Sequence, residues 1–526
     1  MADQQIPEGR KNEGGINSKF SRDEVCGKMP VEEGFKQVEE YGIEPPFSSV
    51  QILMNKKSGE YVYKVIEPAL DDWMKELVVH ARKRFVSDIT GFQESRRERE
   101  IYIRDWIERF KEGSQISDID KEKLFYYLYR EFEGYGKIQV PILDENVEDI
   151  SCDGSNIPIY IFHKRLGSIT SSISFEDEEQ LDKYVSWIVQ KAGRHISIAV
   201  PMADCTLPNG SRLQATLGRE VTRRGSSFTI RRFRDDPFTP LDLVRLKTIS
   251  TDAAVYLWQA VEEGRNMFII GGTASGKTTT LNSTLLFIPS GKKIVSIEDT
   301  REINIPHENW VPTLTRLGTG DVNPITKKRV GEVDMFDLLV SSLRQRPNYI
   351  VVGEVRGPEA YTVFQSMATG QTAYSTFHSS DISSFIHRLE GEPLKIPRSM
   401  ISSLDVVVLQ AQIRMGDEIV RRVKKIVEIV GIERISNEVI TNTVFEWEQA
   451  TDRINYSGHS YLYEKILREQ NWSLEQLNEE IMRRKEFLEK MAEEGRINYR
   501  DFTERINNYQ RGMKSSVHVK GRDEGV

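Results

Sequence analysis

The sequence predicts an α/β protein with three structured parts: an α+β N-terminal domain, a central domain on a mostly parallel sheet, and a small charged helical region. Three observations support this prediction. Helical spacing of apolar residues dominates residues 67–135, short apolar strands alternate with helical segments after residue 246, and amphipathic stripes return after residue 435. The predicted division is a mobile tail (1–45), an N-terminal domain (46–235), a linker (236–245), a central domain (246–434) and a helical region (435–526).

The composition indicates a soluble globular chain. Its 526 residues correspond to about three or four domains at roughly 100 to 200 residues each. The formal net charge of -8 has the wrong sign for a dedicated nucleic-acid coat. The three cysteines are widely separated, so we expect no disulfide framework and no zinc site. Because no apolar run reaches the roughly 18 residues of a membrane span, we expect a cytoplasmic protein that meets the membrane only through partners.

The N-terminal domain is predicted from a change of hydrophobic period. Helical spacing of three and four residues joins Leu70, Trp73, Met74, Leu77, Val78 and Ala81. Further helices are expected at about 99–112 and 121–133. Short β-like runs follow at 138–143, 157–162 and 226–230, separated by Gly, Asn, Asp and Pro. The order of helices and then strands indicates an α+β domain.

The central domain is predicted from three apolar strands, at residues 267–271, 293–298 and 348–353, which alternate with helical segments. This alternation is typical of a mostly parallel sheet. A Pro-containing connector at 236–245 precedes it.

The C-terminal region is predicted to be helical from its caps and stripes. Ser473 and Gln476 form the pattern of a capping box at a helix start. The first apolar stripe consists of Leu474, Leu477, Ile481, Leu488 and Met491, and the second of Tyr499, Phe502, Ile506 and Tyr509.

The most specific pattern is G-x-x-x-x-G-K-T at residues 271–278, placed after an apolar strand and before a helical segment. Its glycines let successive backbone N–H groups face a phosphate, and the helix adds its positive N-terminal end. Lys277 is expected to reach the β- and γ-phosphates, and the Thr278 hydroxyl to bind Mg²⁺. The sequence therefore predicts a site for ATP and Mg²⁺. Its expected nucleotide-binding residues are Gly271, Gly272, Thr273, Ala274, Ser275, Gly276, Lys277, Thr278 and Thr279.

Two predicted strands end in carboxylates. Glu298, Asp299 and Glu302 follow one strand, and Glu354 follows another. Because parallel strands present their carboxyl ends at one edge of the sheet, both groups are expected to converge on the nucleotide. One carboxylate would hold the Mg²⁺ shell through water, and another would orient the attacking water. The alternative is that each acidic residue only caps a helix.

Arginines and one histidine complete the candidate site. The arginines fall in two groups: Arg316, Arg344, Arg346 and Arg356 around the acidic strand ends, and Arg212, Arg231 and Arg232 before the linker. Charge that develops on the γ-phosphoryl group favours an arginine supplied in cis or in trans, although most such arginines are ordinary surface charges. His378 would sense the γ-phosphate or communicate between subunits, whereas His387 is expected to pack on a helix.

Four blocks, in this order, resemble the secretion and type IV filament ATPases, a branch of the RecA-type P-loop NTPases. GGTASGKT resembles their Walker A motif, IEDTRE (297–302) their acidic Asp box, LRQRPNYIVVGEVRGPEA (343–360) their Walker B motif, and ATGQTAYSTFH (368–378) their His box. Residues 141–163 and 207–218 resemble the N-terminal domain of the same family. The sequence is most similar to archaeal members, which are archaellum motors and pilus or secretion ATPases.

This resemblance implies a homo-hexameric ring with a RecA-type motor domain, in which nucleotide lies between the N-terminal and motor domains. Arg212 and Arg231 match arginines that the family places at the nucleotide from the N-terminal side. The implied partner is a polytopic membrane platform protein, on which the motor drives addition of pilin-like subunits. No nucleic acid is expected as a partner.

The motif match also implies roles for single residues. Either Glu298 or Glu302 would polarise the attacking water, and Glu354 would act at the metal. The expected catalytic residues are Glu298, Glu302, Glu354, Arg212, Arg231, Arg344, Arg356 and His378, with Mg²⁺ held by Thr278 and, through water, by Glu354.

The sequence departs from the family pattern in two places. Gln371 occupies the position of the first His in the His box, so His378 carries that motif alone, and the tetra-cysteine zinc insertion of bacterial relatives is missing. Two other functions stay open. A nucleic-acid translocase or conjugation-type traffic ATPase shares the motifs, but the net charge of -8 disfavours it. A scaffold that binds nucleotide without hydrolysis conflicts with the intact Lys277 and Glu354.

Overall fold

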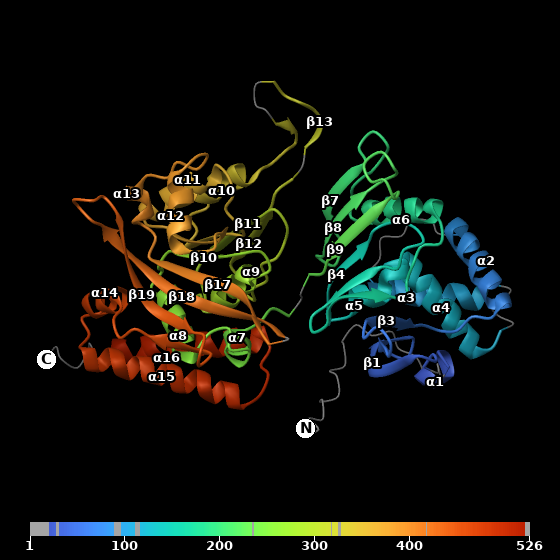
Figure 1. The fold of residues 1–526 in the computed structure, drawn as a ribbon, viewed down its shortest axis with the longest axis horizontal. Coiled ribbons are helices and arrows are strands. Elements are labelled where there is room, and N and C mark those ends of the chain that lie inside the picture. The colour runs from blue at the N-terminus through green and yellow to red at the C-terminus, as the bar shows by residue number, and fades with distance from the viewer. Residues whose placement is uncertain are drawn as a thin grey trace. The chain divides into compact units, whose positions relative to one another are not determined.

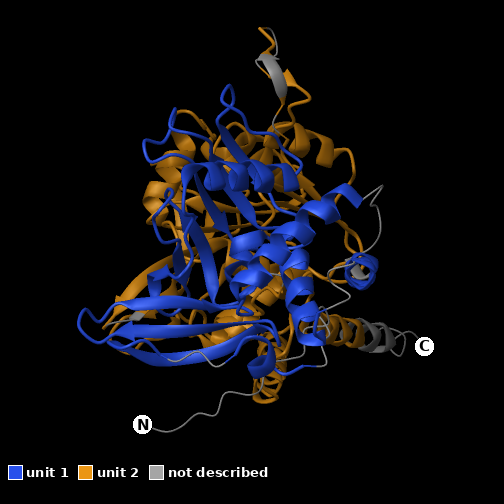
Figure 2. Ribbon diagram, turned by 90° about the vertical axis from the view of Figure 1, so that its right-hand side faces the viewer, with its two compact units in different colours: residues 1–233 blue, residues 234–526 orange. Residues whose placement is uncertain are grey.

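A computed structural model of the chain describes residues 20–27, 31–88, 96–110, 116–233, 236–316, 318–324, 328–416 and 418–520 (Figure 1). The chain divides into two compact units, residues 1–233 and 234–526, which are coloured separately in Figure 2. Each unit has its own nine-stranded sheet. Within the described ranges, no helix is long and apolar enough to cross a membrane.

Unit 1 is an α+β unit whose sheet has the strand order β1-β2-β3-β6-β5-β4-β9-β8-β7. Its strands are β1 (Phe35–Glu44), β2 (Ser48–Asn55), β3 (Tyr61–Ile66), β4 (Val147–Cys152), β5 (Tyr160–His163), β6 (Gly167–Ser171), β7 (Met202–Thr206), β8 (Arg212–Thr216) and β9 (Ser227–Arg231). Its helices are α1 (Arg22–Val25), α2 (Asp72–Asp88), α3 (Arg96–Arg109), α4 (Asp118–Phe132), the 3-10 helix η2 (Gly136–Ile138), α5 (Gln139–Leu143) and α6 (Glu178–Lys191).

Two hydrophobic cores hold unit 1 together. Helix α6 places Leu181, Val185, Ile188 and Val189 on one face at helical spacing, and all four are buried against the sheet. Helices α2, α3 and α4 enclose a separate aromatic core, in which the Phe85 ring meets the Trp106 ring edge-on. The predicted order of helices and then strands is found from α2 onward, but strands β1, β2 and β3 precede these helices and were not predicted.

Unit 1 also differs from the sequence predictions in the predicted tail, where residues 22–25 form α1, and in one predicted strand. Residues 35–44, placed in the mobile tail, form β1 and pair with β2; residues 1–19 and 28–30 of that tail lie outside the described residues. Charged residues on an edge strand hide the apolar alternation by which strands are recognised. The β-like run at 138–143 is helical, as η2 and α5, because a short apolar run containing a proline does not by itself distinguish strand from helix.

Unit 2 is built on a sheet with the strand order β12-β11-β15-β16-β10-β17-β18-β19-β20. The first six are parallel and the last three continue the sheet in antiparallel fashion. The strands are β10 (Met267–Gly271), β11 (Ile294–Glu298), β12 (Trp310–Leu314), β15 (Tyr349–Val352), β16 (Thr372–His378), β17 (Val406–Met415), β18 (Glu418–Ile432), β19 (Val439–Glu448) and β20 (Arg453–Tyr456), with a separate ribbon of β13 (Thr319–Val322) and β14 (Arg329–Val330).

Helices cover both faces of this sheet (Figure 1). The helices of unit 2 are α7 (Pro240–Arg245), α8 (Thr251–Glu262), α9 (Lys277–Leu285), α10 (Met335–Leu343), α11 (Glu359–Ala368), α12 (Ile382–Glu390), α13 (Arg398–Ile401), α14 (Tyr461–Glu469), α15 (Leu474–Glu493) and α16 (Tyr499–Lys520). In β10, Met267 and Ile269 join the core formed with α8, α9 and the C-terminal helices. Phe268 and Ile270 join the core formed with α10 to α13. The strand is therefore apolar throughout, as parallel strands buried on two faces are.

Unit 2 also refines the predicted boundaries. The predicted linker at 236–245 ends in helix α7, which Thr239 and Asp242 cap and which buries Leu241. The region after residue 435 begins with β19 and β20 before its helices start. The capping box of Ser473 and Gln476 is confirmed at the start of α15.

A buried ionic cluster fastens α15 to the core of unit 2. The Arg484 guanidinium donates hydrogen bonds to Glu480 on its own helix and to Glu262 at the end of α8, each at 2.7 Å. It also lies over the ring of Trp258, 4.6 Å from the ring centre. Only 7% of the Arg484 side chain is exposed, so its charge depends on these partners.

We expect Arg484→Ala to lower the free energy of unfolding by about 3–5 kcal/mol, because it leaves the buried Glu480 and the partly buried Glu262 carboxylates without their cation. Arg483→Ala is the matched control. The Arg483 side chain is 59% exposed and its ion pair with Glu480 is longer, 3.5 Å, so its removal should cost less than about 1 kcal/mol. Urea unfolding of both full-length variants measures the difference, and equal losses would contradict the role of the cluster.

Candidate nucleotide-binding site

The predicted phosphate-binding loop joins the end of β10 to the start of α9. Gly276 has φ 93°, and Ala274 also lies in the left-handed region, with φ 57°. The Lys277 ammonium donates a hydrogen bond to the carbonyl oxygen of Gly272 at 2.8 Å, and the Ser275 hydroxyl donates to the same oxygen at 2.9 Å. Lys277 is only 8% exposed, so its ammonium group stays against the loop. The N-terminal N–H groups of α9 open toward this loop, which is the arrangement that favours a bound anion.

Strand β16 brings His378 beside the loop, since His378 pairs in register with Gly271 of β10. The His378 Nε2 atom lies 3.1 Å from Glu354 Oε1, and Arg356 forms an ion pair with the other oxygen of Glu354. We call Glu354, Arg356 and His378 the Glu354 cluster. Burial lowers the pKa of His378 and the positive charge of Lys277 lowers it further, against the opposing effect of Glu354. Glu354 and His378 thus lie together at the carboxyl-end edge of the sheet, beside the loop.

Glu298 lies at the end of β11 and is 2% exposed. Its Oε1 accepts hydrogen bonds from the backbone N–H groups of Glu302 (2.8 Å) and Ile303 (2.9 Å), and its Oε2 is buried without a hydrogen-bond partner. Burial raises the pKa of Glu298 to about 7, although the two N–H groups oppose this shift. The side chain therefore fixes the loop that follows β11, and it is poised to exchange a proton near neutral pH.

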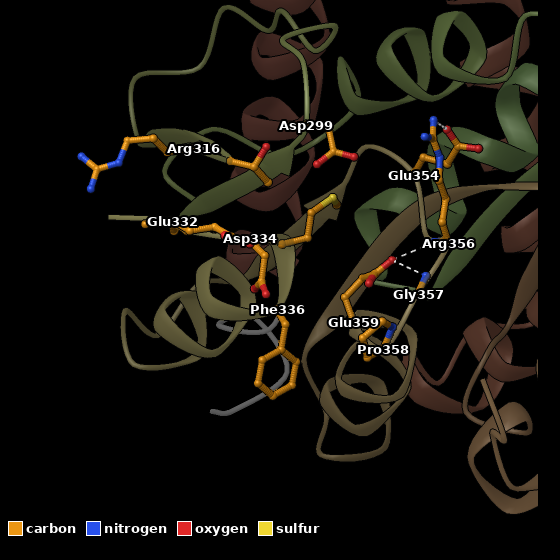
Figure 3. A pocket seen from close by; sticks show the side chains of 13 residues that line it. Asp299, Arg316, Glu332, Asp334, Phe336, Glu354, Arg356, Gly357, Pro358 and Glu359 are labelled. Carbon is orange, nitrogen blue, oxygen red and sulfur yellow. Dashed lines mark hydrogen bonds and ion pairs between the residues drawn. The ribbon is translucent and has the colours of Figure 1, made fainter. Parts of the chain in front are cut away.

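A pocket of about 360 Å³ adjoins the Glu354 cluster (Figure 3). Glu354 and Arg356 lie on one side of it and Arg316 on the other, with Asp299 between them. Its remaining lining residues are Thr315, Glu332, Val333, Asp334, Met335, Phe336, Gly357, Pro358 and Glu359. The Glu359 carboxylate accepts hydrogen bonds from the N–H groups of Arg356 and Gly357, which holds the segment after Glu354 in place.

The structure does not bring all predicted residues into this cluster. Arg344 is exposed at the end of α10, before β15 begins, whereas Glu354 follows the other end of that strand. In unit 1, Arg212 and Arg231 lie side by side on β8 and β9. Arg212 forms a two-point ion pair with Asp204, at 3.1 and 2.6 Å. Within its own unit, then, Arg212 has a carboxylate partner.

Two residues of the candidate site, Thr278 and Glu354, carry the kind of oxygen ligand that Mg²⁺ prefers. This ion prefers oxygen ligands and keeps several waters, so it binds through one or two protein groups together with phosphate oxygens. The hydroxyl of Thr278, in the first turn of α9, and the carboxylate of Glu354 are ligands of this kind. Among the residues that the structure describes, no group of three His, Cys, Asp or Glu side chains is placed to hold a metal ion.

Two residues at the loop were not predicted from the sequence. Gln410 on β17 pairs in register with Gly271, and the Arg421 guanidinium of β18 donates a hydrogen bond to the carbonyl oxygen of Ala274 at 3.0 Å. One signal was available: Gln410 is a polar residue inside the apolar run that begins at Val406. No motif marks Arg421.

Comparison with known proteins defines the class. Residues 137–511 match the family model described as Type II/IV secretion system protein. The chain therefore belongs to this family, which confirms the resemblance found in the four sequence motifs.

Individual relatives are found among archaea and bacteria. "Uncharacterized protein MJ0900" of Methanocaldococcus jannaschii is 38% identical over 358 residues, which cover 68% of this chain and 63% of that protein. The chain thus spans less than two thirds of the length of this relative. "Probable conjugal transfer protein TrbB" of Sinorhizobium fredii is 30% identical over 306 residues, 57% of this chain and 87% of TrbB. The ATPase DotB of Legionella pneumophila is 19% identical, with a TM-score of 0.38 over 54% of this chain and 77% of DotB.

We expect Glu298→Gln to make stability less dependent on pH. Because the pKa of Glu298 is raised to about 7 in the folded chain, its contribution to stability is full below the unfolded pKa near 4.5 and is lost as the pH rises through 7. Glutamine does not titrate. The free energy of unfolding of the variant should therefore rise relative to that of the wild type by on the order of 3 kcal/mol between pH 5 and pH 8. Urea unfolding at both pH values measures the gain, with the exposed Glu308→Gln as control. A constant difference between variant and wild type would show that Glu298 does not titrate in this range.

Proposed function

We propose that the chain is a Mg²⁺-dependent ATPase that works as a homo-hexameric motor. In this proposal it powers the assembly or rotation of an archaellum-like or type IV pilus-like filament, or type II-like secretion, through a polytopic membrane platform protein. The observation that carries the proposal is the Glu354 cluster, which lies at the strand end beside the P-loop, with Lys277 close enough to lower the pKa of His378.

Enzymes catalyse phosphoryl transfer mainly by positioning groups and stabilising charge, with little covalent chemistry of their own. Lys277 and the N-terminus of α9 would hold the phosphates of ATP. Bound Mg²⁺, held by Thr278 and through water by Glu354, would supply charge neutralisation at the phosphate oxygens. Either Glu298 or Glu302 would polarise the attacking water. His378, neutral because its pKa is lowered, would hold the Glu354 carboxylate in place and link it to the P-loop strand.

Family membership supports the assembly part of the proposal. A ring would let Arg212 and Arg231 reach a nucleotide at a domain boundary, where they would stabilise developing charge. The proposed location is the cytoplasmic face of the membrane, with attachment through partner proteins.

A second candidate function is conjugation-type transport of nucleic acid. The name of the relative TrbB, a probable conjugal transfer protein, favours it. The net charge of -8 opposes it, since strand translocation relies on basic segments that follow the phosphate backbone.

One experiment separates the two candidates. ATPase rate is measured against protein concentration with Mg²⁺, while light scattering follows the mass, with and without single-stranded and duplex DNA. A rate per subunit that rises as six-subunit particles form, without a response to DNA, supports the filament or secretion motor. Stimulation by DNA that fades with salt supports the nucleic-acid translocase.

We expect Lys277→Ala to abolish hydrolysis and to weaken nucleotide binding, because it removes the cation that faces the phosphates. Glu354→Gln keeps the shape of its side chain and should leave nucleotide binding within about threefold while turnover falls at least a hundredfold. Binding of a fluorescent ADP analogue and steady-state ATPase rates measure both effects.

Unchanged turnover in Lys277→Ala would contradict the assignment of the active site. Loss of nucleotide binding in Glu354→Gln would show instead that this carboxylate supports the loop rather than the reaction. Arg398→Ala on α13 is the control for general damage, because Arg398 pairs with Glu390 outside the Glu354 cluster.

A further inference from the structure

Strand β17 pairs with β10 on the side opposite β16, and β18 pairs with β17 in antiparallel fashion. Gln410 of β17 touches both glycines that define the motif. A Cβ atom on Gly271 would lie 2.3 Å from the Gln410 carbonyl oxygen, and one on Gly276 would lie 2.9 Å from Gln410 Nε2. Real Cβ atoms do not approach backbone this closely, so Gly271 is needed to admit strand β17. At Gly276 the near atom is a side-chain amide that can move, and glycine is favoured there by its φ of 93°.

Arg421 of β18 holds the part of the loop between these glycines. Its Nε donates to the Ala274 carbonyl oxygen at 3.0 Å, and its Cδ lies 3.3 Å from the position of a Cβ on Gly276. Ala274 has φ 57°, a left-handed conformation that costs a non-glycine residue about 1–2 kcal/mol. A residue kept in this conformation needs support from its surroundings, and Arg421 is one of the groups that supply it.

The neighbouring residue anchors the strand that carries Arg421. Arg422 points to the other face of β18, where it is 5% exposed and donates to both oxygens of Asp452, at 2.8 and 3.0 Å. It also donates to the Leu246 carbonyl oxygen at 3.0 Å. Hydrogen bonding from Arg422 lowers the pKa of Asp452 to about 2. Strand β18 is thus a fixed support, and Arg421 contacts the loop from a defined position.

The choice of glutamine at position 410 also needs an explanation. Gln410 is 2% exposed and its Oε1 is buried without a hydrogen-bond partner. Such a buried amide oxygen costs about 1–3 kcal/mol, which a methionine or leucine would avoid. An amide beside Gly276 is therefore kept at a cost in stability, which points to a role at the loop rather than in the core.

We propose that Gln410 and Arg421 are positioning residues of the P-loop. They hold Ala274 and Gly276 in the bent conformation seen here, so that the loop is ordered before nucleotide arrives and the entropy lost on binding is reduced. They set nucleotide affinity, whereas the Glu354 cluster on the other side of β10 serves hydrolysis. This inference rests on the proposed function in so far as the loop binds nucleotide.

The test uses full-length Gln410→Met and Arg421→Gln, with Gln365→Met and Arg414→Gln as matched controls. Gln365 lies on α11 and Arg414 on β17 beyond the loop, and both are exposed. The first measurement is hydrogen–deuterium exchange of the backbone amides of residues 271–278 without nucleotide. We expect exchange to become at least fivefold faster in Gln410→Met and Arg421→Gln and to stay unchanged in the controls.

The second measurement is the Kd of a fluorescent ADP analogue with Mg²⁺, together with KM and kcat for ATP. We expect Kd and KM to rise about tenfold in Gln410→Met and Arg421→Gln, with kcat within twofold of the wild type. Arg421→Lys keeps the charge and loses the guanidinium geometry, so it should bind as weakly as Arg421→Gln.

Each result decides a separate point. Wild-type exchange and affinity in Gln410→Met and Arg421→Gln, or full affinity in Arg421→Lys, would overturn the positioning role. A kcat that falls while KM is unchanged would also overturn it, since that pattern places the two residues in hydrolysis. If the wild-type chain binds no nucleotide, the proposed function fails, and the exchange measurement still tests whether Gln410 and Arg421 order the loop. Melting temperatures no more than about 3 °C below that of the wild type confirm that each variant is folded.

Discussion

The parallel pairing of β10 with β16 and β17 is the constraint on which the candidate site depends. Because the three strands run in the same direction, their carboxyl ends reach one edge together, and Gly271 lies between His378 and Gln410. The pairing of β11 with β15 brings Glu298 and the segment of Glu354 to the same edge. These side chains share one edge because the register is held by strands that are buried on both faces.

The sequence predicts those parts of the fold in which local pattern and tertiary role agree. The strands at 267–271, 293–298 and 348–353 are continuous apolar runs because both of their faces are covered, so pattern alone identifies them. Lys277, Glu354 and His378 are recognisable because their motifs are short and lie next to these strands. Arg421 was not predicted, since its partner Ala274 is distant in sequence and only strand pairing joins them.

Two other differences between prediction and structure also arise because a local sequence pattern does not fix tertiary position. The run 138–143 is apolar like a strand but is helical, and its length is too short to distinguish the two. Arg344 lies near Glu354 in sequence, but the four residues of β15 separate them. The two side chains therefore lie at opposite ends of that strand. Proximity in sequence therefore does not place Arg344 beside Glu354 within one chain.

The register of β18 against β17 contains a bulge, since Leu409 pairs with Lys425 and Gln410 pairs with Val423, which leaves Lys424 as an extra residue. Lys424 has no partner of its own on β17, so its loss during evolution would restore a regular ladder. Arg421 and Arg422 would stay opposite Gln412 and Ala411 and would keep their faces of the sheet. A relative with a one-residue gap at this point is therefore aligned with this chain by its strand partners, because counting residues along the strand would exchange its two arginines.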